Sequence, residues 1–180
     1  RSTNAQKSEE YRRLNPSGRI PTLVHNDQAL CESAAIALYL CENHPEKKLL
    51  PAINSPKRQE CYEWLFYLTT TLQPELMLYF YPEKHTTHKT LASTIKEAQE
   101  QRIIDIFALL ETKLAGNSFL LGEHITLCDY FLFMLAHWAS GLKTPPLAFP
   151  NLKKYLQHLA SRDSFVQVCN TEGTNLAIYA

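Results

Sequence analysis

Two segments of the chain combine residue types that suit an extended, anionic, peptide-like ligand. Residues 15–24 read Asn-Pro-Ser-Gly-Arg-Ile-Pro-Thr-Leu-Val, and residues 31–40 read Cys-Glu-Ser-Ala-Ala-Ile-Ala-Leu-Tyr-Leu. The first offers main-chain groups beside a rigid proline, and the second begins a helix, whose first N–H groups can hold a carboxylate. Together they predict a binding site for a small peptide.

The bond between Ile20 and Pro21 is predicted to be cis. A prolyl amide keeps a preference for trans of only about 0.5–1 kcal/mol, and a cis bond would turn the N–H and C=O of Ile20 outward. Those groups can pair with a ligand backbone as an added strand does. A trans proline that starts an edge strand is the alternative; the surrounding Asn-Pro-Ser-Gly-Arg string favours cis.

The pair Glu32-Ser33 suits the α-amino-acid end of such a ligand. Ser33 can offer a hydroxyl and a backbone N–H to a carboxylate, and Glu32 can accept from an ammonium group. The helix N-terminus adds about 0.3–1 kcal/mol for the negative group. An ordinary helix cap is the alternative, and the position of the pair across a predicted hairpin from Ile-Pro favours binding.

The elements that position these residues follow from the spacing of apolar side chains. Residues 20–31 are strand-like, and Asn26-Asp27 predicts the turn of a hairpin. From Glu32 the apolar residues recur at three and four, which predicts a helix that ends near Asn43-His44-Pro45. Residues 45–55 are rich in proline and lack periodicity, which is typical of a linker.

A second domain begins with Ser55 as N-cap and Pro56 at the first helical position. Its first helix is predicted to bend or break at Pro74. Further helices are predicted over residues 90–114, 126–140, 151–161 and 164–172. The predicted domains are therefore residues 1–44, a partial α/β unit, and residues 56–180, which are all helical.

Composition excludes several classes of function. The 180 residues carry 18 basic and 18 acidic side chains, so the charge pattern of a nucleic-acid or membrane-surface binder is missing. No apolar run reaches the roughly 18 residues that a membrane-spanning helix needs. The five cysteines show no Cys-x-x-Cys pair and are predicted to be buried thiols, which favours the cytosol.

Residues 120–129 form a second signature, Leu-x-Gly-x-x-x-Thr-x-x-Asp. Thr126 and Asp129 have the spacing of a capping box, with Asp where Glu or Gln is commoner. We interpret this pair as structural and not catalytic.

The two ligand-binding segments resemble the glutathione site of the glutathione S-transferase superfamily, and the capping segment is similar to the folding motif of its helical domain. The resemblance covers residues 7–167. It implies a partial thioredoxin-like, glutathione-binding domain followed by an all-helical C-terminal domain. It also implies that Ile20, Pro21, Glu32 and Ser33 bind glutathione as co-substrate, without a metal, and that the protein is a cytoplasmic homodimer.

In that family a strand, a helix and a second strand precede the Asn-Pro-x-Gly segment and carry the catalytic side chain. This chain begins at Arg1 on a polar stretch. The resemblance therefore places the catalytic residue in a segment before Arg1, and none is assigned here. A thiol of pKa about 8.5 needs such a group to become a thiolate at neutral pH.

Within the superfamily, residues 63–65 (Glu-Trp-Leu) and 136–138 (Ala-His-Trp) resemble most the bacterial beta class. Members of that class usually carry Asn where Phe66 stands and a His-Lys pair where Gln73-Pro74 stands. In that class the His-Lys pair faces the thiol of glutathione. The residues by which the second domain of that class contributes to thiol chemistry are therefore replaced here.

Aromatic side chains of the second domain predict where the other substrate binds. Tyr67, Tyr79 and Trp138 are candidates for lining an apolar pocket for an electrophile, although aromatic residues of this kind are often core. His85 and His88 are the only close histidine pair, and without a cluster of Cys or carboxylates they give little support for zinc.

The resemblance predicts an enzyme that adds the sulfur of glutathione to an apolar electrophile. Two alternatives stay open. One is a non-catalytic, transferase-like protein-interaction module, and the other is a glutathione-dependent thiol–disulfide or dehalogenase-type enzyme on the same fold. Fold alone does not decide among them.

Overall fold

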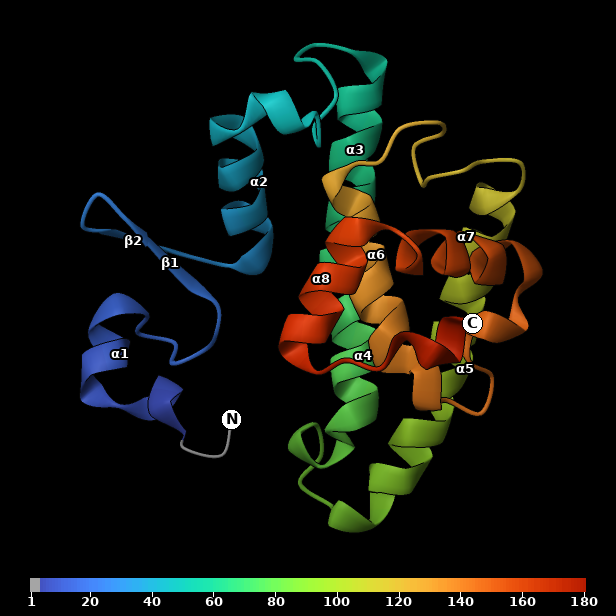
Figure 1. Ribbon diagram of the computed structural model, residues 1–180. Helices are drawn as coiled ribbons and strands as arrows, with labels where there is room; N and C mark the ends of the chain where they lie inside the picture. Colours follow the sequence, from blue (N-terminus) through green and yellow to red (C-terminus); the bar gives the residue numbers. More distant parts are fainter. Residues whose placement is uncertain (1–3) are drawn as a thin grey trace. The chain divides into compact units, whose positions relative to one another are not determined.

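The computed structural model describes residues 4–180 (Figure 1), which divide into two compact units, residues 4–50 and 51–180. The first unit contains helix α1 (Glu9–Leu14), strands β1 (Thr22–His25) and β2 (Gln28–Cys31), and helix α2 (Ser33–Asn43). Short 3₁₀ turns lie at Ala5–Lys7 and Pro45–Lys47. This is the predicted partial α/β unit.

The two strands form an antiparallel hairpin. Thr22 pairs with Cys31, and His25 pairs with Gln28. Asn26 and Asp27 have φ of 50° and 60°, as a two-residue type I′ turn requires, and these residue types tolerate that conformation. The predicted hairpin is confirmed.

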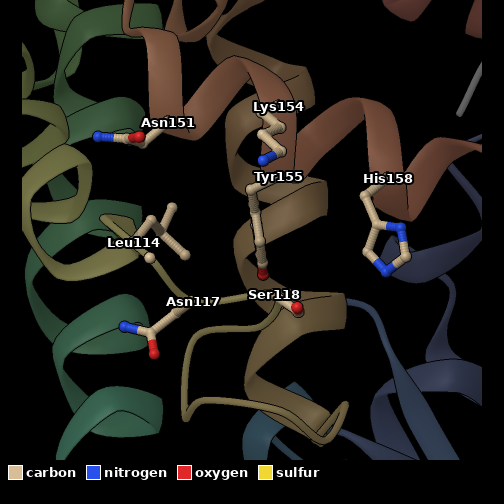
Figure 2. Close-up of a pocket in the computed structure, with 8 residues that line it drawn as sticks. Leu114, Asn117, Ser118, Asn151, Lys154, Tyr155 and His158 are labelled. Atoms are coloured by element: carbon tan, nitrogen blue, oxygen red, sulfur yellow. The ribbon is translucent and has the colours of Figure 1, made fainter.

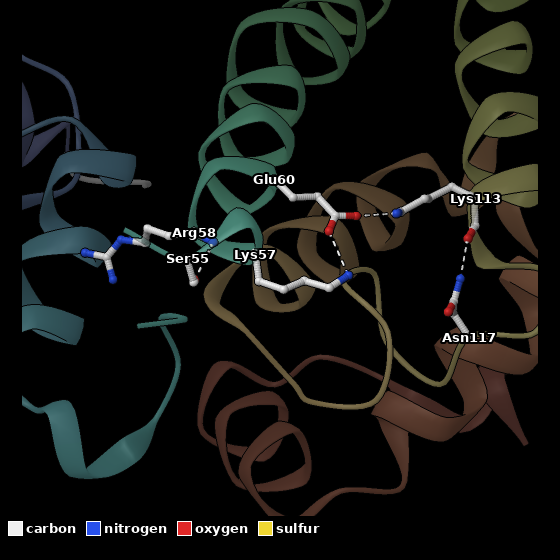
Figure 3. Close-up of polar contacts among 6 residues, drawn as sticks. All are labelled: Ser55, Lys57, Arg58, Glu60, Lys113 and Asn117. Atoms are coloured by element: carbon white, nitrogen blue, oxygen red, sulfur yellow. Dashed lines mark hydrogen bonds and ion pairs between the residues drawn. The ribbon is translucent and has the colours of Figure 1, made fainter. Parts of the chain in front are cut away.

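The second unit starts with a long helical stretch. Helix α3 (Pro56–Tyr67) begins at Ser55, whose Oγ accepts from the N–H of Arg58 at 3.1 Å (Figure 3). A π-helical segment (Leu68–Leu72) follows, and then α4 (Gln73–Phe80). A bend or a break is predicted at Pro74, and the structure shows no break, because the helical stretch continues through this residue. Pro74 lies in the first turn of α4, directly after the wider π turn, where its missing N–H is tolerated.

The remaining helices are α5 (Ala92–Leu114), α6 (Leu127–Trp138), α7 (Pro150–Ala160) and α8 (Asp163–Glu172). Their bounds agree with the predicted helices to within about two residues. Short 3₁₀ turns lie at Pro82–Lys84, Lys89–Leu91, Ala139–Gly141, Pro146–Ala148 and Leu176–Tyr179. Helix α1 and the last turn are elements that apolar periodicity did not indicate.

The core of this unit lies between α6 and the helices around it (Figure 1). Helix α6 packs against α3 and α4, α5 against α4 and α7, and α7 against α8. The largest fully buried side chains of this core are Leu65, Leu68, Leu72, Leu76, Ile103, Phe107, Leu110, Leu120, Leu132, Leu135, Leu152 and Leu156.

A carboxylate joins α3 to α5 (Figure 3). Glu60 contacts Lys57 at 2.7 Å and Lys113 at 2.5 Å. Burial acts to raise the pKa of Glu60, but the two ammonium groups outweigh it, so that the pKa lies below its usual value.

Among residues 4–180, no helix has the length and apolar character required to cross a membrane.

Candidate functional site

The four predicted ligand residues lie at one end of the hairpin. The last ladder pair is Thr22 with Cys31. Pro21 and Ile20 precede Thr22, and Glu32 and Ser33 follow Cys31. All four therefore lie within two residues of that pair, at the open end of the hairpin, where β1 begins and β2 turns into α2.

Ile20 presents its main chain to the outside. The Ile20–Pro21 bond is cis, as the sequence predicts, and Ile20 is 59% exposed. Within residues 4–180 no hydrogen bond occupies its N–H or C=O. Both groups are therefore available for pairing with a ligand backbone.

Glu32 stands in an unusual backbone conformation, with φ of 69° and ψ of 117°. A residue other than glycine in such a region costs about 1–3 kcal/mol, and such outliers cluster at ligand sites. The Glu32 side chain is exposed and does not cap the helix. Its carboxylate is free to accept from a cationic group.

Ser33 begins α2, and the first-turn N–H groups of that helix receive no side-chain cap. The first intrahelical bond is from Ile36 N–H to Glu32 O, at 2.9 Å. The backbone N–H groups before Ile36 therefore lack intrahelical partners. A carboxylate placed there would receive hydrogen bonds from these donors and gain from the helix dipole.

A buried amide supports the loop that leads to Ile20. Asn15 is 4% exposed, and its Nδ2 donates to Arg19 O at 2.8 Å and to Thr22 Oγ1 at 3.3 Å. Its Oδ1 accepts from the N–H and hydroxyl of Ser17, at 3.1 and 2.6 Å. Tyr11 Oη donates to Arg19 O at 2.7 Å. The residues on both sides of Ile20-Pro21 are thus held in place.

Gly18 is required by the same loop. It has φ of +60°, and a Cβ at this position would lie 3.1 Å from Gln6 O. Its N–H donates to Asn15 O at 2.9 Å. The sequence alone gives no role to Tyr11 or Asn15. The turn residues Asn-Pro-Ser-Gly were the signal that the loop before Ile20 is held by hydrogen bonds.

In the second unit, a cavity of about 460 Å³ lies between α6 and α8, with a mostly apolar lining. Of the three predicted pocket residues, only Trp138 lines it. Tyr67 instead packs edge-on against Trp64 at 5.4 Å, and Tyr79 is buried with Lys96 Nζ 4.6 Å from its ring. Helical spacing alone does not show which aromatic side chains pack against neighbouring residues and which line a cavity. The cavity's further aromatic residues are Tyr130, Phe133 and Phe165.

His137 lines this cavity, and its pKa lies below the usual value of a histidine. Burial lowers the pKa of His137 by disfavouring the charged imidazolium. Its Nδ1 lies 3.1 Å from Tyr179 Oη, in the last 3₁₀ turn of the chain. Burial also raises the pKa of the Tyr179 phenol.

Asp129 is a structural carboxylate in the core. It is fully buried and accepts four hydrogen bonds: from Leu120 N–H (2.8 Å), Thr126 N–H (2.6 Å), Thr126 Oγ1 (3.0 Å) and Tyr155 Oη (2.8 Å). Burial raises its pKa, and the hydrogen bonds oppose that rise. Thr126 and Asp129 therefore connect the start of α6 to the preceding loop and to α7.

Phe66 and Gln73, which stand where the beta class usually carries Asn and a His-Lys pair, do not line the cavity between α6 and α8. Phe66 is 55% exposed on α3, and Gln73 is half-buried at the start of α4. Neither of them carries a charge that could stabilise a thiolate.

The cysteines are all free thiols. Cys61, Cys128 and Cys169 are buried, as predicted, whereas Cys31 and Cys41 are half-buried because they lie on the hairpin and on α2, where less chain covers them. Among residues 4–180 no group of three potential ligands could hold a metal ion. His85 and His88 are exposed and lie between α4 and α5.

Comparison with known proteins identifies the family. The sequence model described as "Glutathione S-transferase, C-terminal domain" matches residues 68–163, and "Glutathione S-transferase, N-terminal domain" matches residues 2–48. Glutathione S-transferase GstA of Escherichia coli O157:H7 is 26% identical over 169 residues, which are 93% of this chain and 81% of that protein.

Solved structures agree. A sphingomonad glutathione S-transferase, complexed with glutathione, has a TM-score of 0.81 at 25% identity and covers 93% of this chain and 81% of its own. The beta-class enzyme of Sphingomonas chungbukensis has a TM-score of 0.80 at 23% identity, covering 93% and 80%, which shows the fold. The predicted resemblance is confirmed: the chain belongs to the glutathione S-transferase family.

Proposed function

We propose that this protein is a glutathione S-transferase that joins the sulfur of glutathione to an apolar electrophile. The observation that carries the proposal is the position of Ile20, Pro21, Glu32 and Ser33, all within two residues of the last ladder pair at the open end of the hairpin. The sphingomonad relative was solved with glutathione bound, which supports the same co-substrate here.

The γ-glutamyl end and the central peptide groups of glutathione have proposed partners in this unit. The carboxylate of the γ-glutamyl residue binds the Ser33 hydroxyl and the uncapped N–H groups of α2. Its ammonium group binds the Glu32 carboxylate. The peptide groups of the central cysteine pair with the free main chain of Ile20. No metal takes part in this scheme.

Activation of the thiol needs a further residue. We propose that it lies in the segment that the family places before Arg1, because the four binding residues hold the ends and backbone of glutathione and not its sulfur. A hydrogen-bond donor or a positive charge there would lower the thiol's pKa from about 8.5 toward neutral pH.

The apolar cavity between α6 and α8 supports binding of an apolar second substrate. We propose Trp138 as its aromatic wall. Tyr67 and Tyr79 do not line this cavity: Tyr67 packs against Trp64, and Tyr79 is buried in the core.

We also propose a cytoplasmic homodimer. Helices α3 and α4 expose large apolar side chains that a second copy could cover. These are Tyr62 (37% exposed), Phe66 (55%), Met77 (40%) and Phe80 (41%). Sedimentation of Phe66→Glu at micromolar concentration should give a monomer, whereas an unchanged dimer would place the interface elsewhere.

Calorimetric titration tests the glutathione site. The wild type should bind glutathione with a Kd between micromolar and low millimolar. Ser33→Ala should weaken binding about tenfold, since a charge-assisted hydrogen bond is lost. Ser140→Ala, an exposed serine outside the site, is the matched control. Equal affinities of both variants would refute the role of Ser33.

The non-catalytic interaction module is a second candidate, and the uncharged Phe66 and Gln73 positions favour it. A folded protein that binds glutathione but never consumes it with any electrophile would support this candidate. A thiol–disulfide or dehalogenase-type enzyme would instead release oxidised glutathione or halide, which an assay of products distinguishes.

A further inference from the structure

A second cavity, of about 260 Å³, lies in the helical unit between the end of α5, the loop after it and α7 (Figure 2). It is smaller than the roughly 300–1,000 Å³ of pockets for drug-sized ligands. Its lining is mostly polar: Leu114, Gly116, Asn117, Ser118, Asn151, Lys154, Tyr155 and His158. Nothing in the glutathione site or the apolar cavity involves these residues.

Several of the polar groups here already have structural partners. The first N–H groups of α7, on Asn151 and Leu152, donate to the Glu111 carboxylate at 3.0 and 2.8 Å. Asn117 Nδ2 donates to Lys113 O at 2.8 Å and thereby caps the end of α5. These bonds use the backbone groups at the start of α7 and at the end of α5. Neither helix end therefore provides the groups that would bind a ligand in this cavity.

Tyr155 forms the floor of the cavity and is also engaged. Its hydroxyl donates to the buried carboxylate of Asp129 at 2.8 Å. Asp129 in turn has all its acceptor capacity used by donors in the core. No acidic side chain lines this cavity.

Three lining side chains make no hydrogen bond or ion pair among residues 4–180. They are Lys154, His158 and Ser118, and all three are exposed. Lys154 and His158 stand one turn apart on α7, and both line the cavity together with Ser118 (Figure 2). The His158 ring rests against Phe119 at 5.2 Å, which limits its movement.

Once the structural bonds are accounted for, the cavity offers hydrogen-bond donors, one of them the lysine ammonium of Lys154, and no unused carboxylate. A tetrahedral oxyanion with several acceptor oxygens and two negative charges matches this set, and lysine is a common phosphate ligand. We propose that this cavity binds the phosphate group of a small molecule, at a site separate from that for glutathione.

Calorimetry in a low-salt, phosphate-free buffer tests the proposal, with inorganic phosphate and glycerol 3-phosphate as probes. At least one should bind saturably with one site per chain. Lys154→Ala should weaken that binding about tenfold, and Ser118→Ala by a smaller factor. Tighter binding of glycerol 3-phosphate would indicate an organic phosphate as ligand, and equal binding would indicate free phosphate.

Lys153→Ala is the matched control, because Lys153 is also exposed on α7 but does not line the cavity. Its affinity should stay within twofold of the wild type, and glutathione binding should be unchanged in all three variants. Circular dichroism confirms that each is folded. The proposal is overturned if neither probe binds saturably, or if Lys153→Ala weakens binding as much as Lys154→Ala.

Discussion

Replacing Asp129 by Ala should destabilise the protein far more than loss of a helix cap does. A lost N-terminal cap costs about 0.5–2 kcal/mol. The substitution also leaves two buried donors, Leu120 N–H and Tyr155 O–H, without an acceptor, at about 1–3 kcal/mol each. We therefore expect the free energy of unfolding to fall by about 3–5 kcal/mol.

Urea denaturation followed by circular dichroism measures this loss. Asp163→Ala, an exposed acidic residue in the first turn of α8, is the control and should cost about 0.5 kcal/mol or less. Tyr155→Phe should cost about 1 kcal/mol, and combining it with Asp129→Ala should cost less than the sum of the two. A loss below about 1 kcal/mol for Asp129→Ala would refute the argument that its carboxylate satisfies buried donors.

Three further results are expected. Gly18→Ala should lower stability by about 1–2 kcal/mol in thermal unfolding, because its φ of +60° and the nearby Gln6 O oppose a side chain, and no loss would contradict this. Glu32→Gln should weaken glutathione binding about tenfold in calorimetry, while Glu10→Gln, also exposed, should not. Because burial lowers the pKa of His137, the unfolded state takes up its proton first. Stability should therefore fall as pH drops below about 6.5, and His137→Gln should flatten that dependence.

Local signals in the sequence predict much of this fold. Asn26-Asp27 indicates the hairpin turn, since few other residues tolerate its positive φ values. Ser55-Pro56 marks the start of α3, and Thr126 with Asp129 marks the start of α6. These elements depend on chemistry within a few residues, so the sequence alone is sufficient for them.

Features that depend on distant partners were not predictable in the same way. Asn15 reads as a turn residue, and only its burial against Arg19 O and Thr22 shows that it supports the site. Pro74 suggests a break that the π-helical turn before it avoids. Tyr79 has helical spacing like Trp138, yet packing places one in the core and the other at a cavity.

The central claim is that glutathione binds at the open end of the hairpin, and amide NMR during a glutathione titration tests it most directly. We expect saturable shifts of the amide signals of Ile20 and Ser33 and of the first turn of α2, with much smaller shifts for the capping residues around Asp129. Saturable binding that leaves the amides of Ile20 and Ser33 unmoved would show that glutathione binds elsewhere.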